Sequence, residues 1–267
     1  METRRRNLLN QLEAAATKPL RTHEDLVALN DAFISLTFKI MYGLPDELQF
    51  RAAFHMCERY LPIFEKKQPS SSWARQLIGD LDAWFRAERD STPEIPDDSD
   101  SADTSYQYGF TNLLVGYHYR DDPACLTAGV CGMILHVVNA RAQNVFLADD
   151  PIAARIEREK DAYHRMKDAH HRNEDGTYRE DEEDYPPEPG YFNDLWKSEH
   201  SASDNVVFLA VYCRECLHLA EWLGAQEVWK YPEPDDLEAM KLGLKRWEEG
   251  ECTPLLPERK ETSVAPE

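Results

Sequence analysis

Residues 50–64 have the sequence FRAAFHMCERYLPIF, in which apolar side chains recur every three or four positions. This spacing places Phe50, Cys57 and Phe64 on one face of an α-helix. The same period returns later in the chain, at Val206, Leu209, Cys213, Cys216, Ala220 and Leu223. Only 11 Gly and 16 Pro are present, too few for a turn-dense all-β fold. The sequence therefore predicts an all-α protein.

Start and stop signals divide this periodic sequence into helices. Gly43 and Pro45 end one helix and begin the next, while Asp122 and Asp150 are N-cap acids that each precede a proline. Pro62 predicts a kink or an early end, because it has no backbone donor. We expect an irregular bundle or array of about nine helices, with the two most apolar ones, 123–148 and 203–224, at its centre. The predicted helices span residues 4–17, 23–42, 46–65, 71–90, 105–119, 123–148, 151–171, 203–224 and 235–248.

Two acidic segments interrupt the helical pattern. Residues 91–104 contain five acids and no base, and residues 173–190 contain eight acids against one Arg. Segments this polar cannot bury enough apolar surface to order themselves, so we expect two acidic loops. We expect one helical domain over residues 1–249, with a possible subdivision near 91–104, and a flexible tail at 250–267.

The charge of the chain restricts its partners. The 267 residues include 50 Asp and Glu but 30 Lys and Arg, which gives a net charge of −20. Such a surface repels nucleic acids and anionic membranes and attracts a basic macromolecule. We see no signal peptide and no run of 18 uncharged apolar residues. We therefore expect a cytoplasmic protein with a basic protein partner, and neither a nucleic acid nor a membrane partner.

The sequence predicts that the cysteines and several histidines are core residues. All six cysteines are expected to be free thiols, since a cytoplasmic chain of this length needs no disulfide. Cys213 and Cys216 share a helical face, but His218 lies about 200° around the helix from Cys216, which argues against a metal site there. His55, His118 and His136 lie beside apolar stretches and are expected to be hydrogen-bonded core residues.

A metal-dependent helical-bundle enzyme is one alternative that the sequence leaves open. Four potential ligands follow one another at helical spacing: Asp161, His164, Asp168 and His171. Glu215 and His218 form a further carboxylate–imidazole pair on another predicted helix, as carboxylate-bridged metal sites in bundles do. The first stripe, however, lies about 120° from the apolar face of its helix, which favours an ion-paired, solvated surface. We expect neither a cofactor nor catalytic residues.

A run of consecutive carboxylates offers a partner-binding surface. Acids and neighbouring aromatic rings together form the candidate site, namely Glu180, Asp181, Glu182, Glu183, Asp184, Tyr185 and Tyr191. Charge of this density speeds encounter with a cationic partner, while aromatic side chains provide anchors that lose their water on binding. A solvated loop without a partner is the alternative, and it leaves the chain as a plain helical scaffold.

Residues 51–88 resemble the immunity proteins of bacterial polymorphic toxin systems. The resemblance lies in Cys57-Glu-Arg59 and Leu61-Pro-Ile-Phe-Glu65, followed after a polar gap by a second helix that ends in Trp84-Phe-Arg-Ala-Glu88. Residues 105–148, with Cys125, Ala128, Cys131 and Ala140, correspond in this resemblance to the small-residue helices that follow in the family. With them the resemblance covers about a third of the chain, and it implies a non-enzymatic inhibitor of a co-encoded toxin. A nuclease toxin is commonly basic, so the resemblance and the net charge imply the same kind of partner.

Overall fold

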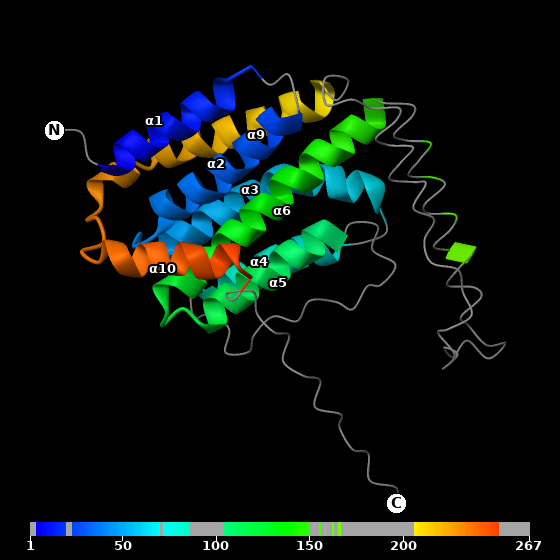
Figure 1. Cartoon of the computed structure of the whole chain (residues 1–267). Helices are drawn as coiled ribbons and strands as arrows, with labels where there is room; N and C mark the ends of the chain where they lie inside the picture. Colours follow the sequence, from blue (N-terminus) through cyan, green and yellow to red (C-terminus); the bar gives the residue numbers. More distant parts are fainter. Residues whose placement is uncertain are drawn as a thin grey trace, which may run out of the picture.

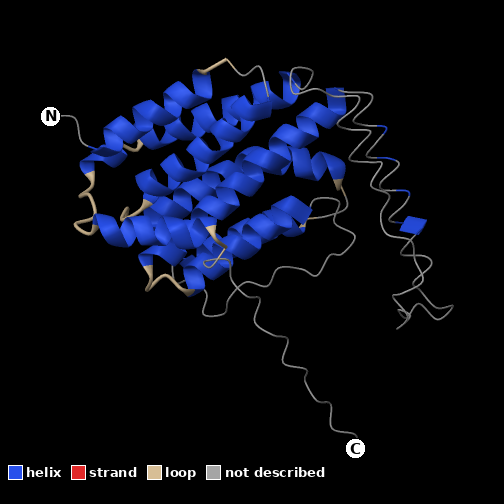
Figure 2. Ribbon diagram, in the orientation of Figure 1, coloured by secondary structure: helices blue, strands red, loops and turns tan. Residues whose placement is uncertain are grey.

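The computed structural model describes residues 4–19, 23–69, 72–85, 104–149 and 206–250, together with Arg155, Arg158, Ala162, Arg165 and Met166. Figure 2 shows that every regular element in this part of the chain is a helix, which confirms the all-α prediction. The elements are α1 (Arg4–Thr17), α2 (His23–Met41), α3 (Asp46–Lys67), α4 (Trp73–Phe85), α5 (Thr104–His118), α6 (Pro123–Asp149), α9 (Val206–Ala225), the short 3₁₀-helix η2 (Val228–Lys230) and α10 (Leu237–Glu248).

Local signals set the ends of these helices close to the predicted positions. Gly43 follows α2 with φ +75°, a left-handed conformation that glycine adopts without steric cost. The Asp122 carboxylate caps α6, since its Oδ1 accepts from the backbone N–H groups of Ala124 at 2.9 Å and Cys125 at 3.4 Å. The Asp236 side chain caps α10 in the same way.

The sequence predicts that Pro62 kinks or ends its helix, and of these two outcomes the structure excludes the early end, because α3 continues to Lys67. Pro62 cannot donate to the carbonyl of Glu58 one turn earlier, but both residues are exposed, so water is available to this part of the helix. The helix predicted over 71–90 begins at Trp73, since residue 72 is not helical. Other predicted features lie outside the described residues: residues 86–90, both acidic loops apart from Thr104, and the tail after Gly250. Of the predicted helix 151–171, the five residues that are described are all helical.

Helix α6 is the centre of the bundle, as the sequence predicted. It contacts α2, α3, α5, α9 and α10. Helix α9, which the sequence also predicted to be central, instead lies beside α1 along one edge of the bundle (Figure 1). By length and composition, Pro123–Val145 could cross a membrane, with a mean hydropathy of 1.5. However, 72% of its most apolar window is buried inside the structure, as in the core helix of a water-soluble bundle.

Glycines bring α5 unusually close to α6. A Cβ added to Gly129 would meet the carbonyl oxygen of Asn112 and the Cα of Gly116, each at 2.5 Å. A Cβ on Gly116 would in turn lie 2.8 Å from the Cα of Gly129. Because these neighbours are backbone atoms, they cannot move aside as a side chain would, and any larger residue would push the helices apart.

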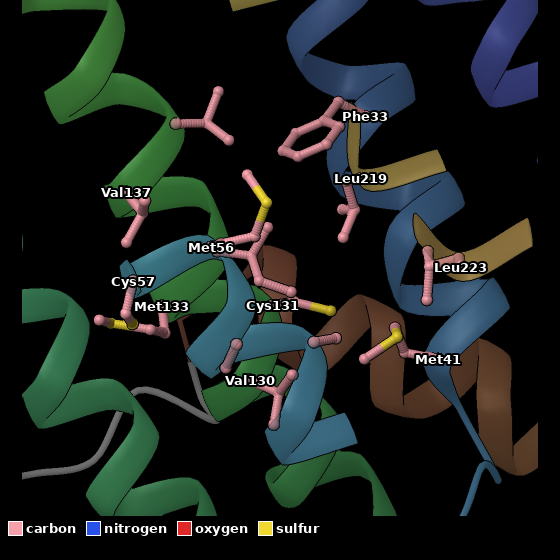
Figure 3. Packing of buried hydrophobic residues seen from close by; sticks show 14 of the residues in the cluster. Phe33, Met41, Met56, Cys57, Val130, Cys131, Met133, Val137, Leu219 and Leu223 are labelled. Carbon is pink, nitrogen blue, oxygen red and sulfur yellow. The ribbon is translucent and has the colours of Figure 1, made fainter. Parts of the chain in front are cut away.

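One hydrophobic core takes side chains from each of the eight α-helices whose bounds are given above. Figure 3 shows Phe33, Met56, Val137 and Leu219, from four different helices, converging on the same region. Each is at most 1% exposed. Helices that are distant in the sequence therefore share a single apolar interior.

Arg5 fastens the start of α1 to two distant segments. The side chain is 2% exposed, and its guanidinium donates to the backbone carbonyls of Ile40 at 3.1 Å, Tyr42 at 2.7 Å, Tyr231 at 2.9 Å and Pro232 at 2.6 Å. Burial lowers the pKa of Arg5, although the charge of Glu233 opposes this shift. The end of α2 and the segment before α10 are thus held by one cation.

Candidate functional site

The most polar feature of the interior is a carboxylate enclosed by three helices. Glu215 of α9 is fully buried, and both of its oxygens accept hydrogen bonds from guanidinium groups. Arg59 of α3 donates from Nε to Oε2 at 2.9 Å and from Nη2 to Oε1 at 3.0 Å. Arg141 of α6 donates from Nε to Oε1 at 2.6 Å and from Nη1 to the Arg59 carbonyl at 2.6 Å. We call these three residues the Glu215 triad.

The two arginines keep Glu215 ionised. Burial by itself would raise the pKa of Glu215, but the hydrogen bonds and positive charges of Arg59 and Arg141 outweigh it, so the pKa lies below its ordinary value. A carboxylate in this state neither donates nor takes up a proton at neutral pH. The triad carries a net charge of +1, and its geometry joins α3, α6 and α9.

A pair of histidines lies next to the Glu215 triad. The Nε2 atoms of His55 on α3 and His218 on α9 are 2.7 Å apart, a hydrogen-bond distance that requires one of them to carry the proton. The ring centroids are 4.9 Å apart and the ring planes differ by 25°. Rings in near-contact through their nitrogens at this centroid separation meet edge to edge, so the contact is a hydrogen bond rather than face-to-face stacking.

Burial and positive neighbours hold both imidazoles neutral. Desolvation is the first cause that lowers the pKa of His55, followed by the charges of His218 and Arg59. Desolvation also lowers the pKa of His218, with Arg59 and Arg141 acting in the same direction and Glu215 and Glu221 opposing them. Trp222 of α9 lies 5.3 Å from the His55 ring and within 19° of parallel, which fixes the orientation of that ring.

This geometry does not fit the ligand role that the sequence suggested for Glu215 and His218. A metal ion would have to displace Arg59 or Arg141 from Glu215 and His55 from His218. Among the described residues, no group of three or more His, Cys, Asp or Glu could hold a metal ion. Asp161, His164, Asp168 and His171 lie outside the described residues.

The other predicted core residues divide into two outcomes. Cys57, Cys125, Cys131, Cys213 and Cys216 are free thiols, as predicted, whereas Cys252 is not described. Burial raises the pKa of Cys57 and Cys216, so these thiols are unreactive. His118 is exposed at the end of α5, where its ring packs against Tyr119, so its prediction as a core residue is wrong. His136 is half-buried, and burial lowers its pKa.

The sequence analysis missed the partners of Glu215, although a signal for them was present. Arg141 is the single charged residue in Pro123–Val145, an otherwise apolar stretch. A lone cation on a core helix indicates a buried acceptor nearby, such as a carboxylate. Glu215 lies on the other most apolar helix, so pairing the two would have been a sound inference.

The predicted partner-binding residues, Glu180 to Asp184 with Tyr185 and Tyr191, lie outside the described residues. The charge around them is nevertheless uneven along the sequence. Residues 86–103, 150–205 and 251–267 together contain 27 acids and 12 bases, a net of −15, while the remaining 23 acids and 18 bases give −5. The end of α6 and the start of α9, which flank 150–205, lie at the same end of the bundle (Figure 1).

Comparison with known proteins adds no relative. No protein-family model, no curated protein and no solved structure matches this chain. The resemblance of residues 51–88 to immunity proteins therefore rests on the sequence motifs alone.

Proposed function

We propose that this chain is a non-enzymatic acidic binding protein that neutralises a basic protein partner in the cytoplasm, in the manner of an immunity protein for a co-encoded toxin. The observation that carries the proposal is the distribution of charge. Three segments contribute −15 of the net −20, whereas the rest of the chain, with 23 acids and 18 bases, contributes −5. Electrostatic attraction to a basic partner would then act mainly through these segments.

The geometry of the polar interior supports a binding role over catalysis. Acid–base catalysis needs a group whose pKa lies near neutrality and which can reach a substrate. Glu215 is ionised, enclosed and shared between two arginines. The neutral histidines beside it satisfy each other. These groups hold helices together, so the triad acts as a structural device in a rigid scaffold.

Co-expression tests the proposal directly. Each gene adjacent to the gene of this chain is expressed alone and together with it, and growth is measured. We expect one neighbouring product to be basic and toxic, and co-expression of this chain to restore growth. The purified pair should then associate at a rate that falls steeply with added salt, because the attraction is electrostatic. No toxic neighbour, or association that does not change with salt, would contradict the proposal.

A matched pair of charge-reversal variants tests which acidic residues bind the partner. In the first variant, all five acids from Glu180 to Asp184 become Lys, which raises the net charge by 10. The control reverses five exposed acids of the described part of the chain, namely Asp31, Glu58, Asp121, Asp235 and Glu248, and raises the charge equally. At low salt we expect association of the first variant to slow by about 10-fold or more. If both variants slow equally, residues 180–184 are not the binding site.

A further inference from the structure

We propose that His55 and His218 form an acid-sensitive clasp between α3 and α9. At neutral pH one Nε2 atom donates its hydrogen to the other across 2.7 Å. One ring must therefore be protonated at Nε2 and the other must not. The pair lies between a helix from the first quarter of the chain and one from its last quarter. It therefore closes a long-range contact rather than stabilising a local turn.

The first added proton gives the clasp a charge without opening it. A singly protonated pair still has one N–H to donate and one lone pair to accept, so the hydrogen bond survives. The new charge, however, lies beside the Glu215 triad, which already carries a net charge of +1. Glu221, an exposed acid on α9, is the remaining charged group that acts on His218, and it favours protonation. The arginines and the loss of water oppose it.

The second added proton opens the clasp. Once both Nε2 atoms carry hydrogen, neither can accept, and two cations face each other at hydrogen-bond distance. The rings must separate, and the α3–α9 contact around them loosens. Trp222 limits how far the His55 ring can turn, because the two rings lie within 19° of parallel. We therefore expect separation of the helices to be the response, rather than reorientation of the ring.

The sign of the pH effect follows from the neutral state of the pair. Since both histidines titrate below their ordinary 6.5 in the folded chain, the unfolded chain binds more protons. The contribution of the clasp to stability is then complete above about pH 6.5 and is lost as the pH falls through the lower folded values.

Titration of the imidazoles by NMR, on the full chain in EDTA, tests the shared proton. We expect two steps separated by more than about one pH unit in the wild type, because the second proton binds a pair that is already charged. In H55Q or H218Q the remaining histidine should titrate in one step that lies between the two. If both histidines titrate in the wild type as they do in the single variants, the clasp does not exist.

A double-mutant cycle tests whether the pair holds α3 and α9 together. We expect the H55Q and H218Q effects on the unfolding equilibrium constant to be non-additive by roughly 5- to 30-fold at pH 8. This coupling should vanish below the pH of the second titration step, where both Nε2 atoms carry hydrogen. The control pairs H55Q with H136Q, a half-buried histidine on α6 whose pKa is lowered by burial alone, and should show no coupling at either pH. Coupling that persists unchanged below the second step would overturn the proposal, as would stabilisation of the wild type by zinc at pH 8.

Discussion

Replacement of Glu215 by Gln is the sharpest test of how the helices are held together. The substitution keeps the size of the side chain but removes its charge. The carboxamide offers one acceptor oxygen and places an NH₂ group against a guanidinium, where two donors face each other. Arg59 and Arg141 would then remain as two neighbouring cations with side chains 26% and 24% exposed. The free energy of unfolding should fall substantially.

The magnitude follows from the burial of the triad. Breaking a buried ion pair by removing one partner costs about 3–5 kcal/mol, because the other charge stays buried without compensation. The partial exposure of the two arginines lets water relieve some of this cost, so we expect about 3 kcal/mol. For a domain of this size that corresponds to a melting temperature lower by roughly 6–12 °C.

Thermal unfolding followed by circular dichroism at pH 8 measures the effect, because both histidines of the clasp and Glu215 are fully deprotonated there. The matched control is Glu65→Gln, which removes an equally well-formed but exposed contact with Arg75 at 2.7 and 2.9 Å. The control should melt with the wild type. A second comparison replaces Glu215, Arg59 and Arg141 together by Met, which should cost less than Glu215→Gln, since no charge is left unpaired. If Glu215→Gln melts within 3 °C of the wild type, the triad does not hold the helices together.

Three further substitutions test single packing features by the same melting assay. Gly129→Ala should lower stability by about 1–3 kcal/mol, because its Cβ meets backbone atoms of α5 at 2.5 Å, whereas Gly79→Ala in α4, with nothing within 4 Å, should stabilise by about 0.5–1 kcal/mol. Arg5→Met should lower the free energy of unfolding by at least about 3 kcal/mol, since four backbone carbonyls lose a charged donor. The control, Arg4→Met, should change it little, and equal effects of the two substitutions would refute the role given to Arg5. Asp122→Ala should lower the free energy of unfolding by about 1 kcal/mol through loss of the α6 cap, whereas Asp121→Ala, at an exposed neighbour, should have no measurable effect. If both variants melt at the wild-type temperature, the Asp122 side chain does not stabilise α6.

The fold class and most helix ends could be predicted because they depend on residues within one or two turns of each other. Asp122 caps α6 through the N–H groups of Ala124 and Cys125, two and three residues on, and Gly43 ends α2 through its own φ. The central position of α6 could also be predicted, because a helix that is apolar on most sides has to be covered. Pro62 shows the limit of a local rule, since its effect depends on whether water reaches the carbonyl left without a donor.

The polar contacts of the interior could not be predicted in the same way, because they join residues that are far apart in the sequence. Glu215 contacts Arg59 and Arg141, which are 156 and 74 residues away. Spacing on one helix made Glu215 and His218 look like a ligand pair, but the partners that define their roles lie on α3 and α6. Arg5 belongs to the same class, since a run of three arginines near the start gives no sign that the middle one is buried.

The two sets of charges in this chain should respond differently to salt, and this separates binding from folding. The Glu215 triad is enclosed by protein, where mobile ions screen it weakly, so added salt should leave its contribution nearly intact. Residues 86–103, 150–205 and 251–267 carry −15 of the net charge of −20, and the attraction to a basic partner that we propose for them would weaken with added salt. Salt also reduces repulsion among the acids of these segments, which favours the folded state if it changes it at all. If added salt slows association but leaves the melting temperature unchanged, the folded protein binds its partner by electrostatic attraction. If salt lowers both the association rate and the melting temperature, the loss of binding follows from loss of the fold.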